Sequence, residues 1–198
     1  SPLILPKKRK ISVPFFLPSV TMNSLTIKAF NTLFYAKGKN TTHITDYDTY
    51  FYPLDGIHHW NRVYGRRGFA QYQFVIPPKD SYNALVKILE KISKARMPSF
   101  LTVLKYFGPQ PGGMLSFPME GYTIALDFPL FKRTFKFLDE LDDIVHACGG
   151  RLYLTKDSRM KPEMLAKGYP NLPEFLALKK QLDTGNRMQS MQSKRLNV

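Results

Sequence analysis

The sequence has little of what several common classes of protein require. It contains a single cysteine, Cys148, so no disulfide can form within the chain, and nothing in the composition indicates an oxidising compartment. It has no run of about 18 apolar residues, which a membrane-spanning helix needs, and no basic start followed by a signal-peptide apolar stretch. We therefore exclude a disulfide-stapled domain and expect the chain as given to be soluble.

Short motifs of common cofactor and catalytic sites are also absent from the sequence. Neither GxGxxG nor GxxxxGK[ST] occurs, so no nucleotide phosphate loop is visible. The four histidines have no HExxH or Cys/His spacing around them, and we expect no metal site. Cys148 has no evident histidine partner for nucleophilic catalysis, and no pair of carboxylates stands out as an acid/base pair. By its own motifs the chain is not a complete enzyme.

Acidic residues are scarce relative to basic ones: 15 Asp and Glu against 29 Lys and Arg give a net charge of +14. This balance fits a nucleic-acid-binding protein, an enzyme with an anionic substrate, or a protein that works against an anionic membrane surface. The basic residues cluster only at 7–10 and 193–195, and no helix-turn-helix, zinc-ligand or RNA-binding aromatic signature occurs. We therefore expect no specific nucleic-acid partner.

What the sequence does have is enough apolar residues for a core and a clear order of elements. Of its 198 residues 43% are hydrophobic and 14% aromatic. Alternation and helical periodicity predict strands and amphipathic helices in turn. The strands are predicted at 70–77, 98–108, 121–129 and 151–157, and the helices begin at Asp80 or Ser81 and at Thr134. This β-α-β-β-α-β order predicts an α+β, ferredoxin-like fold in which helices cover one face of an antiparallel sheet.

The two ends of the chain are less regular. Residues 21–36 alternate weakly and could form a strand. Residues 161–183 predict one or two helices interrupted by prolines, and the polar segment 184–198 is expected to fray if it ends in solvent. This helical tail has little place in a ferredoxin-like unit, so we expect it to dock on something absent from the chain.

The alternation along the strands separates their side chains into two faces. The apolar face is predicted to lie under the helices and consists of Tyr72, Phe74, Ile76, Leu104, Tyr106, Tyr122, Ile124 and Leu126. The opposite, mixed face consists of Gln71, Gln73, Lys105, Phe107, Thr123, Ala125 and Asp127. A solvated face and a wall that covers a ligand explain this second set about equally well.

The stretch GGRLYLTKDSRM (149–160) places Lys156 at the end of a predicted strand. Three charged residues and a hydroxyl in four positions are most simply a solvated turn. A lysine held by a strand end can instead serve a binding site, because it is positioned more rigidly than a lysine on a loop.

Four blocks of the sequence are similar to one enzyme family. They are residues 51–77, 99–110, 115–129 and 149–159. Together and in this order they resemble the C-terminal half of the decaprenylphosphoryl-β-D-ribose 2-oxidase family, flavoenzymes of the vanillyl-alcohol-oxidase type. The broader lactone-oxidase C-terminal domain is a looser relative.

This resemblance implies an enzyme built from an N-terminal FAD-binding domain and a substrate domain, with a last segment that returns to the FAD domain. Residues 1–150 would then be an N-terminally incomplete substrate-binding domain, and 151–198 the last strand and the returning segment. The implied cofactor is FAD, held mostly by a domain absent from this chain. The implied reaction is hydride transfer to flavin from C2 of a polyprenylphosphoryl ribose, and a partner reductase then completes the conversion to arabinose. The implied location is the cytoplasm or the periphery of the membrane and cell envelope.

The resemblance also assigns site residues. Positions that match the family's substrate pocket are Gln73, Lys105, Phe107 and Lys156. Tyr153 matches a residue beside the cofactor. A cation near the flavin N1/C2=O edge stabilises the negative charge that develops as hydride arrives, which makes Lys156 the candidate catalytic and cofactor-contacting residue.

One strand departs from the family pattern. The family has WNICVDFP where this chain has YTIALDFP, so Thr123 and Ala125 stand in place of its asparagine and cysteine. Both positions are implied to face the substrate, and the change leaves the substrate's identity open. Two alternatives therefore stay in view: the C-terminal domain of an aldonolactone oxidase, and a basic ligand- or nucleic-acid-binding module without flavin.

We predict that the chain does not bind duplex DNA tightly at physiological salt. If its positive charge served nucleic acid, the logarithm of the association constant would fall against the logarithm of salt concentration with a slope of about −0.9 for each phosphate contacted. Fluorescence anisotropy of a labelled duplex across a salt series measures this slope. A sub-micromolar Kd at physiological salt would contradict the prediction.

Overall fold

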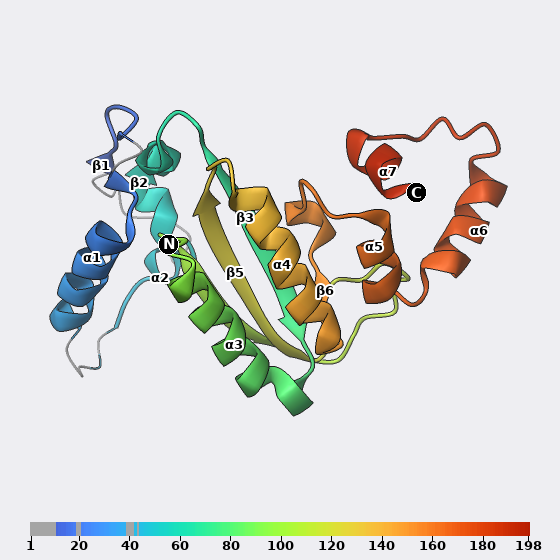
Figure 1. The fold of residues 1–198 in the computed structure, drawn as a ribbon, viewed down its shortest axis with the longest axis horizontal. Coiled ribbons are helices and arrows are strands. Elements are labelled where there is room, and N and C mark those ends of the chain that lie inside the picture. The colour runs from blue at the N-terminus through green and yellow to red at the C-terminus, as the bar shows by residue number, and fades with distance from the viewer. Residues whose placement is uncertain (1–10, 19–20, 39–41, 43) are drawn as a thin grey trace, which may run out of the picture. The chain divides into compact units, whose positions relative to one another are not determined.

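The computed structural model describes residues 11–18, 21–38, 42 and 44–198 (Figure 1). Contacts along the chain divide it into two compact units, Ser1–Phe69 and Ala70–Val198. The sequence-based division after residue 150 assigned the end of the chain to an absent FAD domain, and it stays a prediction.

The N-terminal unit is built from short elements. In it β1 (Ile11–Ser12) pairs in parallel with β2 (Ile57–His58). The α-helices are α1 (Ser24–Lys37) and α2 (Tyr47–Phe51), and two 3₁₀ turns follow at Pro53–Gly56 and Trp60–Tyr64.

Helix α1 overturns the expectation of a strand within residues 21–36. Its first turn is closed by a capping box, in which the Asn23 side chain accepts hydrogen bonds from the backbone amides of Leu25 and Thr26. Thr26 Oγ1 accepts a hydrogen bond from the Asn23 amide in return. Such reciprocal capping satisfies amides that a helix start leaves unpaired, and it outweighed the weak alternation in the sequence.

The C-terminal unit confirms the predicted α+β fold (Figure 1). Its four-stranded antiparallel sheet has the spatial order β4-β5-β3-β6, which is the ferredoxin-like order for β-α-β-β-α-β connectivity. The elements are β3 (Phe69–Ile76), α3 (Ser81–Lys94), β4 (Thr102–Phe107), β5 (Gly121–Pro129), α4 (Thr134–Ala147) and β6 (Arg151–Leu152).

Helices α3 and α4 cover one face of this sheet (Figure 1). Beneath them, the buried side chains of β3 and β5 contact apolar residues of the two helices. The predicted apolar face is confirmed on these central strands, but Leu104, Tyr106 and Tyr122 are 57%, 52% and 38% exposed. The reason is topological: β4 is the edge strand, so its side chains and their cross-strand neighbours extend past the helices.

The last strand is shorter than predicted. Only Arg151–Leu152 are paired as β6, against Phe74 and Val75. The Tyr153 amide still donates to the Gln73 carbonyl, at 2.9 Å, and then the chain leaves the sheet in a 3₁₀ turn, Leu154–Lys156. Lys156 therefore belongs to a turn after the strand, and the predicted strand end at residue 157 is wrong.

The C-terminal tail folds onto its own unit. Its helices are α5 (Pro162–Gly168), α6 (Leu172–Leu182) and α7 (Met191–Leu196), so the predicted break within 161–183 is confirmed. The expectation that the end of the chain frays is wrong for α7, because Leu196 is buried with the core, whereas residues 184–190 are exposed and form no helix or strand. None of the helices in the described part of the chain is both long and apolar enough to cross a bilayer.

A buried ion pair ties the segment after β6 to the rest of the sheet unit. The Arg159 guanidinium donates to both carboxylate oxygens of Asp142 in α4, each at 2.6 Å. Tyr72 Oη in β3 donates to the same carboxylate at 2.9 Å, and the guanidinium lies 5.6 Å from the centre of the Tyr72 ring. Burial raises the pKa of Asp142, although Arg159 and Tyr72 oppose the shift. The carboxylate therefore depends on these donors to stay ionised in the core.

We predict that Arg159→Met destabilises the fold strongly. The substitution leaves the Asp142 side chain, which is 2% exposed, without its counter-ion, and loss of one partner from a buried pair costs about 3–5 kcal/mol. Urea denaturation measures the loss. Lys132→Ala, at an exposed position just before α4, is the control and should stay within about 0.5 kcal/mol of the parent. A parent-like midpoint for Arg159→Met would show that the pair does not stabilise the fold.

Candidate functional site

The candidate site lies on the sheet face opposite α3 and α4, where polar side chains of neighbouring strands meet. Gln73 Nε2 of β3 donates to Thr123 Oγ1 of β5 at 3.2 Å, and Gln71 Nε2 donates to Asp127 Oδ1 at 2.9 Å. Thr123 and Asp127 are 1% and 0% exposed. Because these groups are buried and paired across strands, the face is an ordered polar wall and not a simple solvated surface.

Lys105 extends this row to the edge of the sheet. It lies directly opposite Thr123 in the β4–β5 ladder, and residues paired in this way point their side chains to the same face. The structure therefore brings Gln73, Thr123 and Lys105 into one line across three strands. Ala125 is paired with Val103, two residues along from Thr123, and it is half-buried.

An aromatic stack borders the wall. Phe107, at the end of β4, contacts Phe117 edge-on, with 5.8 Å between ring centres. Phe117 in turn stacks on Tyr153, at 4.3 Å and 21° between planes. The stack joins two predicted site residues through a third that sequence reasoning missed. Phe117 is in the loop between β4 and β5, where no alternation could mark it as 5% exposed.

Lys156 lies beside the same wall. It is exposed, in the turn after β6, and forms no ion pair with any residue that the structure describes. With Gln73 and Tyr153 it lines a hollow of about 10 Å³, about the room of one water molecule. Pockets for small ligands are typically about 300–1,000 Å³. The described residues around this hollow therefore do not by themselves enclose a sugar-sized pocket.

The turn that carries Lys156 is held in place by its neighbour, Asp157. The Asp157 carboxylate accepts hydrogen bonds from the backbone amides of Arg159 and Met160, at 2.9 and 2.7 Å. Arg195 Nη2 of α7 donates to it at 2.7 Å. Burial raises the pKa of Asp157, but these hydrogen bonds outweigh burial and hold it below its ordinary value.

Helix α7 holds the turn at a second point. Gln192 Nε2 donates to the Leu154 carbonyl at 2.6 Å, inside the 3₁₀ turn. Sequence reasoning missed Asp157, Gln192 and Arg195. Only Asp157 had a local signal, since an aspartate followed by backbone amides two and three residues on is typical of a side-chain-capped turn. The other two are brought there by the path of the tail.

A metal centre is not evident in the parts of the chain that the structure describes, which contain no group of three or more His, Cys, Asp or Glu suited to holding an ion. The arrangement instead offers amide donors, two exposed ammonium groups and an aromatic edge. Such a wall suits a ligand that carries both hydroxyl groups and negative charge.

Comparisons with known proteins relate this chain to an oxidase. No family model matches it. It is 33% identical over all 198 residues to decaprenylphosphoryl-β-D-ribose oxidase of Mycolicibacterium smegmatis, and 39% identical over 97 residues to an uncharacterised Streptomyces coelicolor protein from the mprA 5′ region. The chain spans 43% of the first relative's length and the match to the second spans 26%.

The chain is thus an α+β domain related along its whole length to an oxidoreductase. The predicted resemblance to the decaprenylphosphoryl-β-D-ribose 2-oxidase family is confirmed.

We predict that Arg195→Ala releases α7 and loosens the Lys156 turn. The substitution leaves the Asp157 side chain, 4% exposed, without a cationic donor, and a hydrogen bond to a charged group contributes about 1.5–3 kcal/mol. Hydrogen exchange should quicken at residues 154–157 and 191–196, whereas Lys194→Ala, an exposed change in the same helix, should not alter it.

The same contact has a predictable pH dependence. Because folding lowers the pKa of Asp157, its stabilising effect is complete above the ordinary aspartate pKa and disappears as pH falls through the lower folded value. Unchanged hydrogen exchange in Arg195→Ala would show that the contact between Arg195 and Asp157 does not hold α7 and the turn in place.

Proposed function

We propose that this chain is the substrate-binding part of an FAD-dependent oxidoreductase that oxidises the C2 hydroxyl of a polyprenylphosphoryl ribose. The relationship to an oxidase along the entire chain supports this proposal. The observation that carries it is the convergence of Gln73, Tyr153 and Lys156, from two distant segments, on one hollow beside the polar wall.

The described residues fit the ring edge of a flavin. Lys156 presents an ammonium group, and the Tyr153 ring, backed by the buried Phe117 on which it stacks, lies beside it in the same hollow. The sequence has no glycine-rich phosphate loop, so in this proposal the pyrophosphate is held by a separate FAD-binding domain. When bound, FAD supplies the two-electron acceptor for hydride.

The chain's own residues would bind and orient the substrate. Gln73, half-buried and oriented by its hydrogen bond to the buried Thr123 hydroxyl, offers an amide to a sugar. Lys105, exposed at the sheet edge, can pair with the substrate phosphate. Lys156 would stabilise the negative charge that develops on the flavin. The hydrogen bonds of Asp157 hold the turn that carries Lys156 before substrate binds, and such preorganisation makes electrostatic stabilisation effective.

The remaining parts of the proposal concern the protein's partners. The keto sugar formed by oxidation at C2 requires reduction to give the arabinose epimer, so a partner reductase must follow. A substrate on a polyprenyl phosphate is embedded in a membrane by its lipid chain, so the enzyme would work at the periphery of the cell envelope.

We predict that Lys156→Ala in the flavin-loaded enzyme slows flavin reduction by substrate by a factor of about 10²–10³, as for loss of a preorganised donor. Stability should stay within about 0.5 kcal/mol, because the side chain is exposed and unpaired among the described residues. Lys156→Arg should not rescue the rate, since a planar guanidinium differs in reach and shape from an ammonium.

Single-turnover flavin bleaching and thermal melting measure the two effects. Lys161→Ala, an exposed lysine five residues along the chain, is the matched control and should leave both unchanged. A Lys156→Ala rate within a few-fold of the parent would show that this lysine is only a turn residue.

A further inference from the structure

Arg151 is a buried cation that the proposed oxidase site does not yet use. It lies at the start of β6, is 7% exposed, and forms no ion pair with a carboxylate of the described residues. Burial lowers the pKa of its guanidinium, and only the nearby Tyr169 opposes this shift. Its buried Nε has no hydrogen-bond partner in the part of the chain that the structure describes. A cation in such surroundings costs stability, so an apolar side chain would fill the same space at lower cost.

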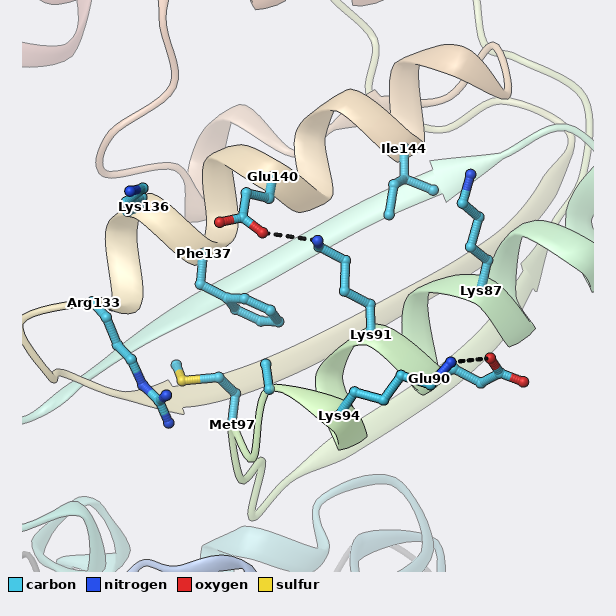
Figure 2. A pocket seen from close by; sticks show the side chains of 11 residues that line it. Lys87, Glu90, Lys91, Lys94, Met97, Arg133, Lys136, Phe137, Glu140 and Ile144 are labelled. Carbon is cyan, nitrogen blue, oxygen red and sulfur yellow. Dashed lines mark hydrogen bonds and ion pairs between the residues drawn. The ribbon is translucent and has the colours of Figure 1, made fainter.

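Two other cations of the sheet unit show the usual arrangement, in which a carboxylate neutralises the charge. Lys91, which lines a groove between α3 and α4, pairs with Glu140 at 2.8 Å (Figure 2). Arg159 in the core is paired with Asp142. Arg151 differs from both, because its guanidinium contacts a backbone carbonyl and an aromatic ring.

The Arg151 side chain belongs to the wall side of the sheet. Arg151 is paired in register with Val75 of β3, and residues directly opposite each other point to the same face. Val75 is two residues after Gln73, so alternation places Gln73, Val75 and Arg151 on one face. The guanidinium is therefore on the side of the polar wall, away from α3 and α4.

On this side the guanidinium holds the loop between β4 and β5. Arg151 Nη1 donates to the Ser116 carbonyl at 2.9 Å, across 35 positions of the chain. That carbonyl belongs to the peptide group that joins Ser116 to Phe117, so the hydrogen bond fixes the backbone from which the Phe117 ring extends. The ring in turn stacks on Tyr153, with 4.3 Å between ring centres. Arg151 is thus connected to the Tyr153 ring through the loop.

Residues at the end of α5 hold the guanidinium itself in place. Its central carbon lies 5.3 Å from the centre of the Tyr169 ring, which is 1% exposed. The Tyr169 hydroxyl donates to the Leu152 carbonyl at 2.6 Å, which fixes the ring against β6. A Cβ on Gly168 would lie 3.1 Å from the Arg151 Cβ, so the helix end also packs closely on the arginine stem. The arginine is therefore held by the tail and donates to the loop.

We propose that Arg151 is a positioning residue of the oxidase site, which holds the Ser116 carbonyl and thereby fixes Phe117 and, through it, the Tyr153 ring beside the flavin. An apolar side chain could fill the same space but could not donate a directional hydrogen bond to the loop. The need for this donor accounts for a buried cation without a carboxylate. Arg151 itself would touch neither substrate nor flavin. This role rests on the proposed function, whereas the anchoring of the loop does not.

Hydrogen exchange of the full chain measures the anchoring without flavin or turnover. In Arg151→Met the backbone amides of residues 114–117 should exchange at least about tenfold faster, because a hydrogen bond from a charged donor contributes more than a factor of ten to an equilibrium constant. Ile88→Val, which removes one methylene from the buried core of the same unit, is the control for a general loss of stability. It should leave exchange at residues 114–117 near the parental rate.

The flavin-loaded enzyme measures the effect on the site. Arg151→Met should slow flavin reduction at saturating substrate by about tenfold or more, since misplacement by about 1 Å can cost a factor of about 10². The substrate concentration for half the maximal rate should change little, because Arg151 does not contact substrate. The flavin absorption maximum should shift, because the aromatic ring beside it moves. Ile88→Val should alter neither the rate nor the spectrum.

A double-mutant cycle with Phe117→Leu identifies the route of the effect. If Arg151 acts through Phe117, Arg151→Met/Phe117→Leu should reduce flavin no more slowly than the slower single variant, whereas independent effects multiply. Arg151→Gln, whose amide ends short of the Nη1 position, should behave like Arg151→Met and replaces it if the methionine variant does not fold. Thermal melting identifies the folded variants.

The outcomes separate this role from the proposed function. Parental exchange at residues 114–117 in a folded Arg151 variant, faster exchange with parental flavin reduction, multiplied effects in the cycle, or equal slowing in Ile88→Val would each overturn the positioning role. A flavin-loaded parent that accepts no hydride from polyprenylphosphoryl ribose would overturn the proposed function and the oxidase role of Arg151 with it. The exchange result would still show whether Arg151 anchors the loop.

Discussion

The ion pair between Arg159 and Asp142 is the constraint on which the sheet unit's C-terminal half depends. It joins the segment after β6 to α4, and through Tyr72 it reaches the central strand β3. A buried carboxylate without its donors is costly, so the pair fixes where the chain must pass once it leaves the sheet. The turn before Arg159 then has little freedom, and that turn carries Lys156.

The ion pair between Arg159 and Asp142 also positions the segment that carries the candidate site. Asp157, two residues before Arg159, accepts hydrogen bonds from backbone amides of the turn and from the guanidinium of Arg195, which connects the turn to α7. The turn held by these contacts places Lys156 beside the polar wall of β3 and β5. These contacts hold the backbone of the turn and leave the Lys156 side chain exposed, so in the proposed site the tail would position the residue that carries the cation.

The two faces of the sheet unit differ in the side chains that they present. On one face, buried cross-strand pairs and an aromatic stack form a wall for a polar, anionic ligand. On the other, the helices bury the core beneath them and present lysines and apolar side chains outward.

The sequence by itself determined the α+β class, the β-α-β-β-α-β order and the two faces of the central strands, because alternation and helical periodicity are local properties. The sequence also showed the relationship to an oxidase family, because that relationship is read from the order of the residues along the chain. Tertiary structure alone decided that Leu104 and Tyr106 are exposed, since an edge strand has the same alternation as a central one. It likewise ended β6 early and brought Phe117 and Arg195 to the site, because contacts between distant segments leave no periodic trace in the sequence.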